Sequence, residues 1–439
     1  MTAAQAPTQQ ESARPRESIS APPAPVTARP RSTGSRLGPL PVLNVVVLEI
    51  GLALSLGLST LDHGLWGAAV ILLLLVVPLA LGRWHGQWLL QSVQLATRYL
   101  VRSHGRSVPS PDPSATASTS APELDDSRIA LLRLLLPDLT IAHGVDRQRE
   151  PLGLAWQRGT WTAVLEVDAA ASMITPVGGA AALPLGALAS CLEDRGVALD
   201  AIQVIWHCYP GSAALPSSSP ALRSYLEVLG PLPAAARRTT WIAVRLDPRR
   251  CPAAVAERGG GVTGCHRALI AALSRVRATL ESRGVPTRPL DADQLLRAGI
   301  SAAELSAVAG TGQSVALSEA WTAVTAAGVG HASYAITGWG IAGAVHNLNA
   351  LTGVRALSTT VALSISPGSP GPPDELTAAG VGEVGLRGLV RLSARNPAEL
   401  ESADGHLRAV SQRLGVALRP LGGLQAAGLA ATLPLGAPG

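Results

Sequence analysis

The sequence contains no lysine and no phenylalanine, so all 35 basic residues are arginine. A chain without lysine cannot supply a P-loop lysine, a kinase-type lysine or a Schiff-base lysine, which excludes three classes of catalytic site. Aromatic residues are also scarce, at 3% of the chain. A pI near 9.5 could indicate nucleic-acid binding, but the arginines are scattered and form no stripe interleaved with aromatic residues. We therefore expect no nucleic-acid partner.

The cysteines form no CxxC pair, so neither a zinc knuckle nor a thioredoxin-type motif is available. They are Cys191, Cys208, Cys251 and Cys265. Cys265 is followed directly by His266, but adjacent residues on a helix point in different directions and zinc needs four ligands in a tetrahedron. We predict a plain helix surface there, no metal, no cofactor, and the reduced thiols typical of a cytoplasmic domain.

Two long apolar runs stand near the N-terminus, over residues 40–82. The first reads PVLNVVVLEIGLALSLGLST and the second LWGAAVILLLLVVPLALG, each close to the roughly 20 apolar residues of a membrane-spanning helix. Only Leu61-Asp62-His63-Gly64 separates them. Because the break is so short, the second helix must run antiparallel to the first. The sequence therefore predicts a two-helix transmembrane hairpin with both flanks on one side of the membrane.

Arginines flank this hairpin on both sides and are missing from its loop. By the positive-inside rule, both chain ends are cytoplasmic and the protein has two spans in the inner membrane. A signal peptide is the competing interpretation of the first run, and it is disfavoured because the run begins about 40 residues into the chain and a second run follows. The flanking residues are Arg14, Arg16, Arg29, Arg31 and Arg36 before the hairpin, and Arg83, Arg98, Arg102 and Arg106 after it.

Glu49 lies near the middle of the first predicted span, where an unpartnered ionisable group costs at least about 2.5 kcal/mol. With Ala53 and Gly57 it occupies successive i, i+4 positions, so a carboxyl group and two small residues share one helix face. The face suits contact with the transmembrane helix of a partner subunit. A protonated glutamate bonded within the hairpin is the alternative, and the sequence leaves both open.

Composition divides the chain into five parts. Residues 1–36 are rich in Pro, Ala, Ser, Thr and Arg, which is typical of a disordered basic tail. The hairpin at 40–82 is followed by a predicted interfacial helix at 83–102. A Pro/Ser/Thr linker over 103–127 then leads to a cytosolic α/β domain over 128–439.

The predicted interfacial helix carries residues suited to the membrane–water boundary. Trp84 and Trp88 share a helix face, and Arg83 adds a positive charge beside them. Tryptophan and arginine concentrate at that boundary, where anionic headgroups attract the arginine. We expect Arg83, Trp84 and Trp88 to act as membrane-interface anchors.

The remaining chain alternates strand-like and helix-like patterns, which predicts a mixed sheet with helices. Leu152–Gln157 and Trp161–Val167 read as a hairpin, and Ala201–Tyr209 reads as a buried strand. Cys265–Arg283 has the pattern of a long helix. The sequence Ser-Ala-Ala-Glu over Ser301–Glu304 predicts a capping box at the start of a further helix.

Three motifs could carry chemistry, and each has a structural interpretation that the context favours. Gly259–Gly264 satisfies GxGxxG, but a helix pattern precedes it where a dinucleotide site needs a strand. Asp291 and Asp293 form a DxD motif, which also fits an N-cap and first turn of a helix. His207, on the predicted buried strand, has no neighbouring acid or nucleophile motif. The sequence therefore predicts no catalytic residue.

From about residue 40 onward the chain resembles the EccE family of the actinobacterial type VII (ESX) secretion machinery. The resemblance lies in the order of elements, in IAHGVDRQREPLGLAWQRGTWTAVLEV, and in the closing LRPLGGLQAAGLAATLPLG. It implies a structural subunit of an inner-membrane translocon, assembled with EccB, EccC, EccD and the mycosin protease. It also implies a domain like a degenerate glycosyltransferase. The alternative is an enzyme, a membrane-anchored glycosyltransferase that binds a metal at Asp291 and Asp293.

Overall fold

The computed structural model describes most of the chain from residue 28 to residue 436. The described residues are 28–30, 36–37, 40–61, 65–84, 87–108, 127–168, 183–209, 237–311, 313–339, 348, 350–368 and 384–436. Most of the predicted tail at 1–36 and most of the predicted linker at 103–127 lie outside them.

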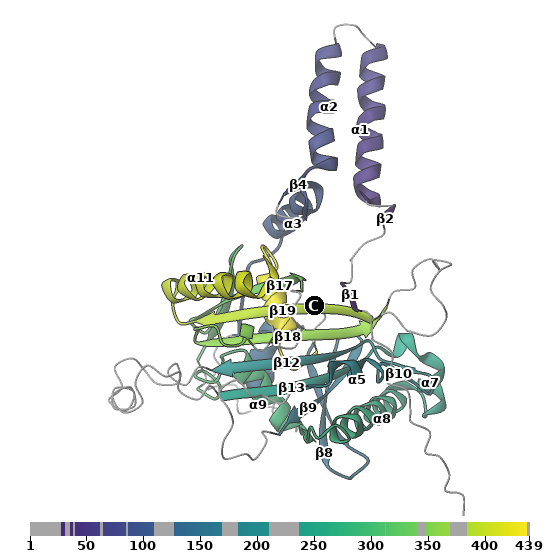
Figure 1. Cartoon of the computed structure of the whole chain (residues 1–439), viewed down its shortest axis with the longest axis vertical. Helices are drawn as coiled ribbons and strands as arrows, with labels where there is room; N and C mark the ends of the chain where they lie inside the picture. The colour runs from purple at the N-terminus through teal and green to yellow at the C-terminus, as the bar shows by residue number, and fades with distance from the viewer. Residues whose placement is uncertain are drawn as a thin grey trace, which may run out of the picture.

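Two apolar helices, α1 (Val42–Leu61) and α2 (Trp66–Leu81), run antiparallel and side by side, and project from a sheet domain (Figure 1). Two polar side chains join them. Asn44 Nδ2 donates to the Ala80 carbonyl at 2.7 Å, and Ser55 Oγ donates to the Ala69 carbonyl at 3.0 Å. Gly51 faces the side chain of Val76, leaving no room for a Cβ, so glycine allows the helices to approach closely.

Among the helices that the structure describes, α1 alone is both long and apolar enough to cross a membrane by itself, over Val42–Thr60. Little of it is buried, since 11% of the apolar window is covered within the protein. The helix α2 is apolar but has 16 residues, and it contains Pro78 near its end. The surface of the helix pair is accordingly apolar. Its exposed large side chains include Leu43, Val46, Ile50, Leu52, Leu54, Leu56, Trp66, Val70, Ile71, Leu74 and Leu75.

The chain does not continue as one helix over 83–102. Instead β4 (Arg83–Trp84) and β5 (Gln87–Trp88) pair as a small antiparallel turn, and α3 (Leu89–Val101) begins after them. The guanidinium of Arg83 lies over the Trp88 ring, 4.0 Å from its centroid. This cation–π contact joins the two strands of the turn. The helical periodicity of the sequence over 83–102 did not indicate that contact.

The sheet domain is built on one 14-stranded sheet, whose neighbouring strands along its main path are antiparallel. A sheet with helices is what the sequence predicted, but only β1 (Ala28–Pro30) beside β19 is parallel among the described strands. In order across the sheet, the strands are β6 (Gly105–Val108), β15 (Val315–Glu319), β16 (Val324–Ala326), β17 (Val329–Gly338), β19 (Val384–Ala394), β18 (Ser358–Pro367), β12 (Ala201–Tyr209), β13 (Arg237–Leu246), β9 (Thr160–Val167), β8 (Pro151–Gln157) and β7 (Thr140–Val145).

Local chemistry explains the predicted hairpin between β8 and β9. Arg158 and Gly159 both have positive φ, 49° and 87°, as the turns of two-residue hairpins require. Pairing of Gln157 with Thr160 closes that turn. The strand β6, by contrast, lies within the range predicted as linker, and its four residues GRSV have no alternating pattern that would have marked them as a strand.

Helices cover both faces of the sheet and bury a core on each. On β12, Ile202 and Val204 face one core and Ile205 faces the other, as the period of two in a strand requires. The first core lies under α8 (Gly261–Glu281) and α11 (Pro397–Leu414). The second lies under α4 (Ser127–Leu135), α9 (Ala292–Ala302) and α12 (Gln425–Ala431).

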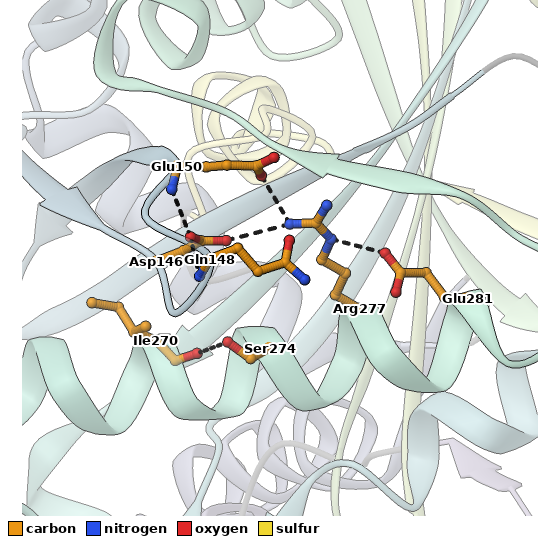
Figure 2. A network of polar contacts seen from close by, with 7 residues as sticks. All are labelled: Asp146, Gln148, Glu150, Ile270, Ser274, Arg277 and Glu281. Atoms are coloured by element: carbon orange, nitrogen blue, oxygen red, sulfur yellow. Dashed lines mark hydrogen bonds and ion pairs between the residues drawn. The ribbon is translucent and has the colours of Figure 1, made fainter.

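Arg277 of α8 ties that helix to the turn between β7 and β8 (Figure 2). Its guanidinium contacts Asp146 at 3.3 Å, Glu150 at 2.9 Å and Glu281 at 2.9 Å. Asp146 also accepts from the backbone nitrogens of Gln148 and Glu150, at 2.7 and 2.8 Å. The turn is therefore held both by its own backbone and from the helix beneath it.

Candidate functional site

The predicted partner-contact face lies on the outside of the helix pair. Asn44, Gly51 and Ser55 are among the positions of α1 that touch α2. Residues of an α-helix are roughly 100° apart, which places Glu49 and Ala53 on the opposite side of α1. Both are exposed. Among the described residues, no hydrogen bond or ion pair within the hairpin reaches the Glu49 carboxyl group, so the bonded-within-the-hairpin alternative has no contact to support it.

Gly57 continues that face one turn further along α1. A Cβ built there would meet no atom within 4 Å, so the space beside it is open. An apolar helix that exposes a carboxyl group, an alanine and a glycine in line offers a neighbouring helix both close approach and one polar partner.

We call the helix pair α1–α2, with the helix α3 that follows it, the anchor. The anchor is joined to the sheet domain by a buried charge that the sequence did not indicate. Glu319, at the end of β15, has a side chain 5% exposed. One carboxylate oxygen lies 2.6 Å from the Arg102 guanidinium, and the other accepts from the backbone nitrogen of Ala426 at 3.0 Å. Arg102 also donates to the Gly423 carbonyl at 2.7 Å. We call Arg102, Glu319 and these two backbone partners the anchor joint.

Aromatic packing completes this joint. The rings of Tyr99 and Trp321 meet edge to face with centroids 5.2 Å apart. Trp321 packs on Gly422 and Gly423, where a Cβ would lie within 3 Å of the indole, so the paired glycines of the C-terminal segment make room for the ring. The strand β6 then pairs with β15, and the Glu319 nitrogen donates to the His104 carbonyl at 2.8 Å.

The DxD motif is a helix cap. Asp291 Oδ1 accepts from the Gln294 nitrogen at 2.7 Å, and the Gln294 side chain accepts from the Asp291 nitrogen at 3.2 Å, which makes a complete capping box. Asp293 pairs with Arg128 and Arg297, and hydrogen bonding to Arg128 first of all lowers the pKa of its carboxyl. Both carboxylates are already partnered.

The glycine-rich stretch and the adjacent Cys265 and His266 also have structural roles. Residues 258–260 connect α7 (Pro252–Glu257) to α8, so the glycine-rich stretch follows a helix rather than a strand. Its glycines Gly259, Gly260 and Gly261 all have positive φ. Cys265 is buried and the His266 ring packs against Trp161, with centroids 4.3 Å apart. Within the described ranges, no group of three His, Cys, Asp or Glu side chains could hold a metal.

A buried polar network lies between β12, β18 and β19, on the face that α9 covers. Arg391 is 0% exposed and donates to the Ala302 carbonyl and to Thr360 Oγ1. His207 shares Thr360 through its Nδ1 at 2.8 Å, and its Nε2 lies 3.7 Å from the carboxylate of Glu304. Burial lowers the pKa of Arg391 to about 10 and raises the pKa of Glu304. His207 is thus buried in the core, and the fold brings the acid Glu304 beside it, which the sequence around His207 did not indicate.

The predicted capping box at Ser301–Glu304 is wrong. Ser301 lies in the last turn of α9, and Glu304 follows that helix with φ 59°. The pattern misled because Glu304 binds inward, to Ser358 and to Tyr209, instead of returning to the Ser301 backbone. Contacts with β12 and β18, distant in sequence, override the local preference.

Comparison with known proteins gives one family and several relatives. Residues 234–336 match the family model of EccE, a type VII ESX secretion system translocon protein. The ESX-1 secretion system protein EccE1 of Mycolicibacterium smegmatis is 42% identical over 64 residues, 15% of this chain and 14% of that protein. The ESX-5 secretion system protein EccE5 of Mycobacterium marinum is 29% identical over 164 residues, 34% of this chain and 40% of that protein.

The chain therefore spans less than half the length of each of these curated relatives in the matched regions. Among solved structures, CrmK, a flavoenzyme of caerulomycin biosynthesis, matches with a TM-score of 0.27 and 10% identity, covering 64% of this chain and 56% of that chain. The matched family region runs from the start of β13 nearly to the end of β17, so it includes α9 and β15, two elements of the sheet domain.

Proposed function

We propose that this chain, a member of the EccE family, is a non-enzymatic structural subunit of a type VII (ESX) protein secretion complex in the inner membrane. The family match over residues 234–336 carries this proposal. Its partners are the other membrane components of such a complex, EccB, EccC, EccD and the mycosin protease. The chain contributes an anchored surface that helps the translocon assemble or stay assembled.

The topology we propose is two spans with both termini cytoplasmic. Its support is that both flanks of the hairpin return to one sheet, because β1 precedes α1 and pairs with β19, while β6 follows α3 and pairs with β15. Chain segments in one domain lie on one side of a membrane, so the hairpin must cross an even number of times. The 20 residues of α1 span about 30 Å and the 16 residues of α2 about 24 Å, so only α2 is shorter than a bilayer core of about 30 Å, by a mismatch that membranes accommodate.

The outward face of α1 is the contact surface we propose for a partner's transmembrane helix. Glu49 supplies a polar group that a partner side chain can bond within the membrane, while Ala53 and Gly57 let the helix backbones approach. At the cytoplasmic end, Arg83, Trp84 and Trp88 anchor the hairpin at the headgroup level. Glycosyltransferase chemistry is not part of the proposal, because the capping box and two arginines already occupy Asp291 and Asp293.

Extraction of the full chain from its native membrane in mild detergent tests this function. We expect it to elute in a large complex with other ESX components, and Glu49→Leu to weaken that complex. Loss of one interhelical hydrogen bond costs about 0.6 kcal/mol and up to about 1.7 kcal/mol, so the affinity should fall by about threefold to twentyfold.

Two further variants control the experiment. Gly57→Leu fills the open face without touching the carboxyl group and should weaken the complex as well. Glu257→Leu removes an exposed glutamate of the sheet domain and should leave it intact. A wild-type chain that elutes as a free monomer from membranes containing the other components would overturn the proposed function.

A further inference from the structure

The two edges of the large sheet are protected differently. The edge strand β6 has four residues, carries Arg106, and lies against α4, where the Arg106 guanidinium donates to the Leu134 carbonyl at 3.1 Å. The opposite edge strand β7 has six residues, TIAHGV, with no charged residue and no proline. Natural sheets usually blunt an exposed edge with charge, proline, a bulge or a cover. The edge β7 has none of these among the described residues.

The hydrogen-bonding direction of each β7 residue follows from the turn at its end. The Asp146 nitrogen donates to the Glu150 carbonyl, which makes this a hydrogen-bonded pair of the β7–β8 hairpin. Such pairs alternate along antiparallel strands, so the backbones of Thr140, Ala142 and Gly144 face β8. The N–H and C=O groups of Ile141, His143 and Val145 therefore face away from the sheet. The Gly153 nitrogen confirms this alternation, since it donates to the Leu290 carbonyl on the side of β8 away from β7.

We propose that β7 is a docking edge that takes an extended segment of a neighbouring subunit as an added antiparallel strand. The inference rests on the proposed function, because the neighbour is another component of the assembled complex. Strand addition gains main-chain hydrogen bonds from groups that already point outward in a row. The edge needs little ordering on binding, because Arg277 and the Asp146 side chain fix the turn at one end of β7 (Figure 2).

A second copy of this chain does not fit as the occupant. The hairpin leaves the sheet domain near β17 and β19, and β8, next to β7, lies at the far end of the sheet (Figure 1). Two copies paired β7 to β7 would be related by a twofold axis at that far end. Their hairpins would then point in opposite directions, so they could not enter one membrane.

Charges at the two ends of β7 define the chemistry of the occupant. Arg147 and Arg149 are exposed beyond its C-terminal end, and Asp138 is exposed before its N-terminal end. An antiparallel segment begins beside Val145 and ends beside Thr140. The complementary segment therefore has an acidic residue, then about six alternating residues without charge, then a basic residue. Val145 is 56% exposed and offers an apolar contact beside the first part of that segment.

Hydrogen exchange of β7 tests the inference in the full chain, free in detergent and within the purified complex. The outward amides of Ile141, His143 and Val145 should exchange fast in the free chain and at least about tenfold more slowly in the complex. The inward amides of Ala142 and Gly144 should be slow in both. Equal rates for the outward amides in the two samples would overturn the inference while leaving the proposed function standing. Slow outward amides in the free chain would also overturn it.

Two variants at one position separate backbone pairing from side-chain contact. His143→Pro removes an outward N–H, and a proline at such a position is compatible with an edge strand. His143→Val keeps that N–H and the extended conformation. We expect His143→Pro to abolish the protection of Ile141 and Val145 in the complex and His143→Val to keep it. Protection of the Leu152 and Leu154 amides verifies that the β7–β8 pairing survives in both variants. Equal behaviour of the two would contradict strand addition, and failure to recover any complex with wild-type chain would instead overturn the proposed function.

Discussion

The anchor and the sheet domain place their large apolar side chains differently. In the helix pair α1–α2, large aliphatic side chains point outward, and within the described ranges the hydrogen bonds between the two helices come from Asn44 and Ser55. In the sheet domain the aliphatic side chains lie inside, and even the guanidinium of Arg391 is fully buried. The sheet domain thus supplies its own interior, whereas the helix pair leaves its apolar side chains on the outside, where lipid or partner helices would cover them under the proposed function.

The polar groups differ in the same way. Glu304, Thr360 and Arg391 lie in one network whose members are distant in sequence, so the network forms only when the sheet does. Glu49 lies on an exposed helix face. A polar group buried with its partners specifies the fold, and a polar group exposed on an apolar face is available to a neighbour.

The largest expected effect comes from removing the centre of the buried network. Arg391→Met deletes the charge beside Glu304 and leaves the Ala302 carbonyl without its donor. Breaking a buried charge network in this way costs about 3–5 kcal/mol. Chemical denaturation of the full chain in detergent, followed by the tryptophan signal, measures this loss. Arg413→Met, at an exposed position in the last turn of α11, should change the unfolding free energy little.

A smaller and more local effect is expected at the anchor joint. Glu319→Ala removes the acceptor of both Arg102 and the Ala426 nitrogen, and hydrogen bonds to charged groups contribute about 1.5–3 kcal/mol. Hydrogen exchange should increase in α3 and β6, while the strands around Arg391 keep their protection. A double-mutant cycle with Arg102→Ala checks the pairing, because additive losses would show that the two side chains do not act together.

Sequence patterns predicted the features whose causes are local. The apolar runs gave the helix pair, and the turn residues Arg158 and Gly159 gave the β8–β9 hairpin. Tertiary pairing could not be predicted in this way. Strand β12 pairs with β18, although more than 100 residues separate the two strands in the sequence. Arg102 donates a hydrogen bond to Gly423, which lies 321 positions further along the chain. No short-range pattern records such contacts.

The candidate site shows the same limit. The i, i+4 spacing placed Glu49, Ala53 and Gly57 on one face, but only the contacts of Asn44 and Ser55 with α2 reveal that this face points outward. At the DxD motif the sequence offered a cap and a metal site together. The Gln294 side chain favours the cap, because it closes the capping box on Asp291.

The smallest expected effect is at that cap. Asp291→Ala removes the acceptor for the Gln294 nitrogen, and losing an N-cap of this kind costs about 0.5–2 kcal/mol. Asp293→Ala removes only exposed ion pairs with Arg128 and Arg297, so its cost should be about 0–1 kcal/mol. Thermal unfolding with and without Mn²⁺ measures both. If Mn²⁺ stabilised the wild type and the stabilisation vanished in Asp291→Ala, the carboxylates would be metal ligands rather than a cap. The sheet domain would then depend on a bound metal ion, and it would no longer differ from the anchor by being self-contained.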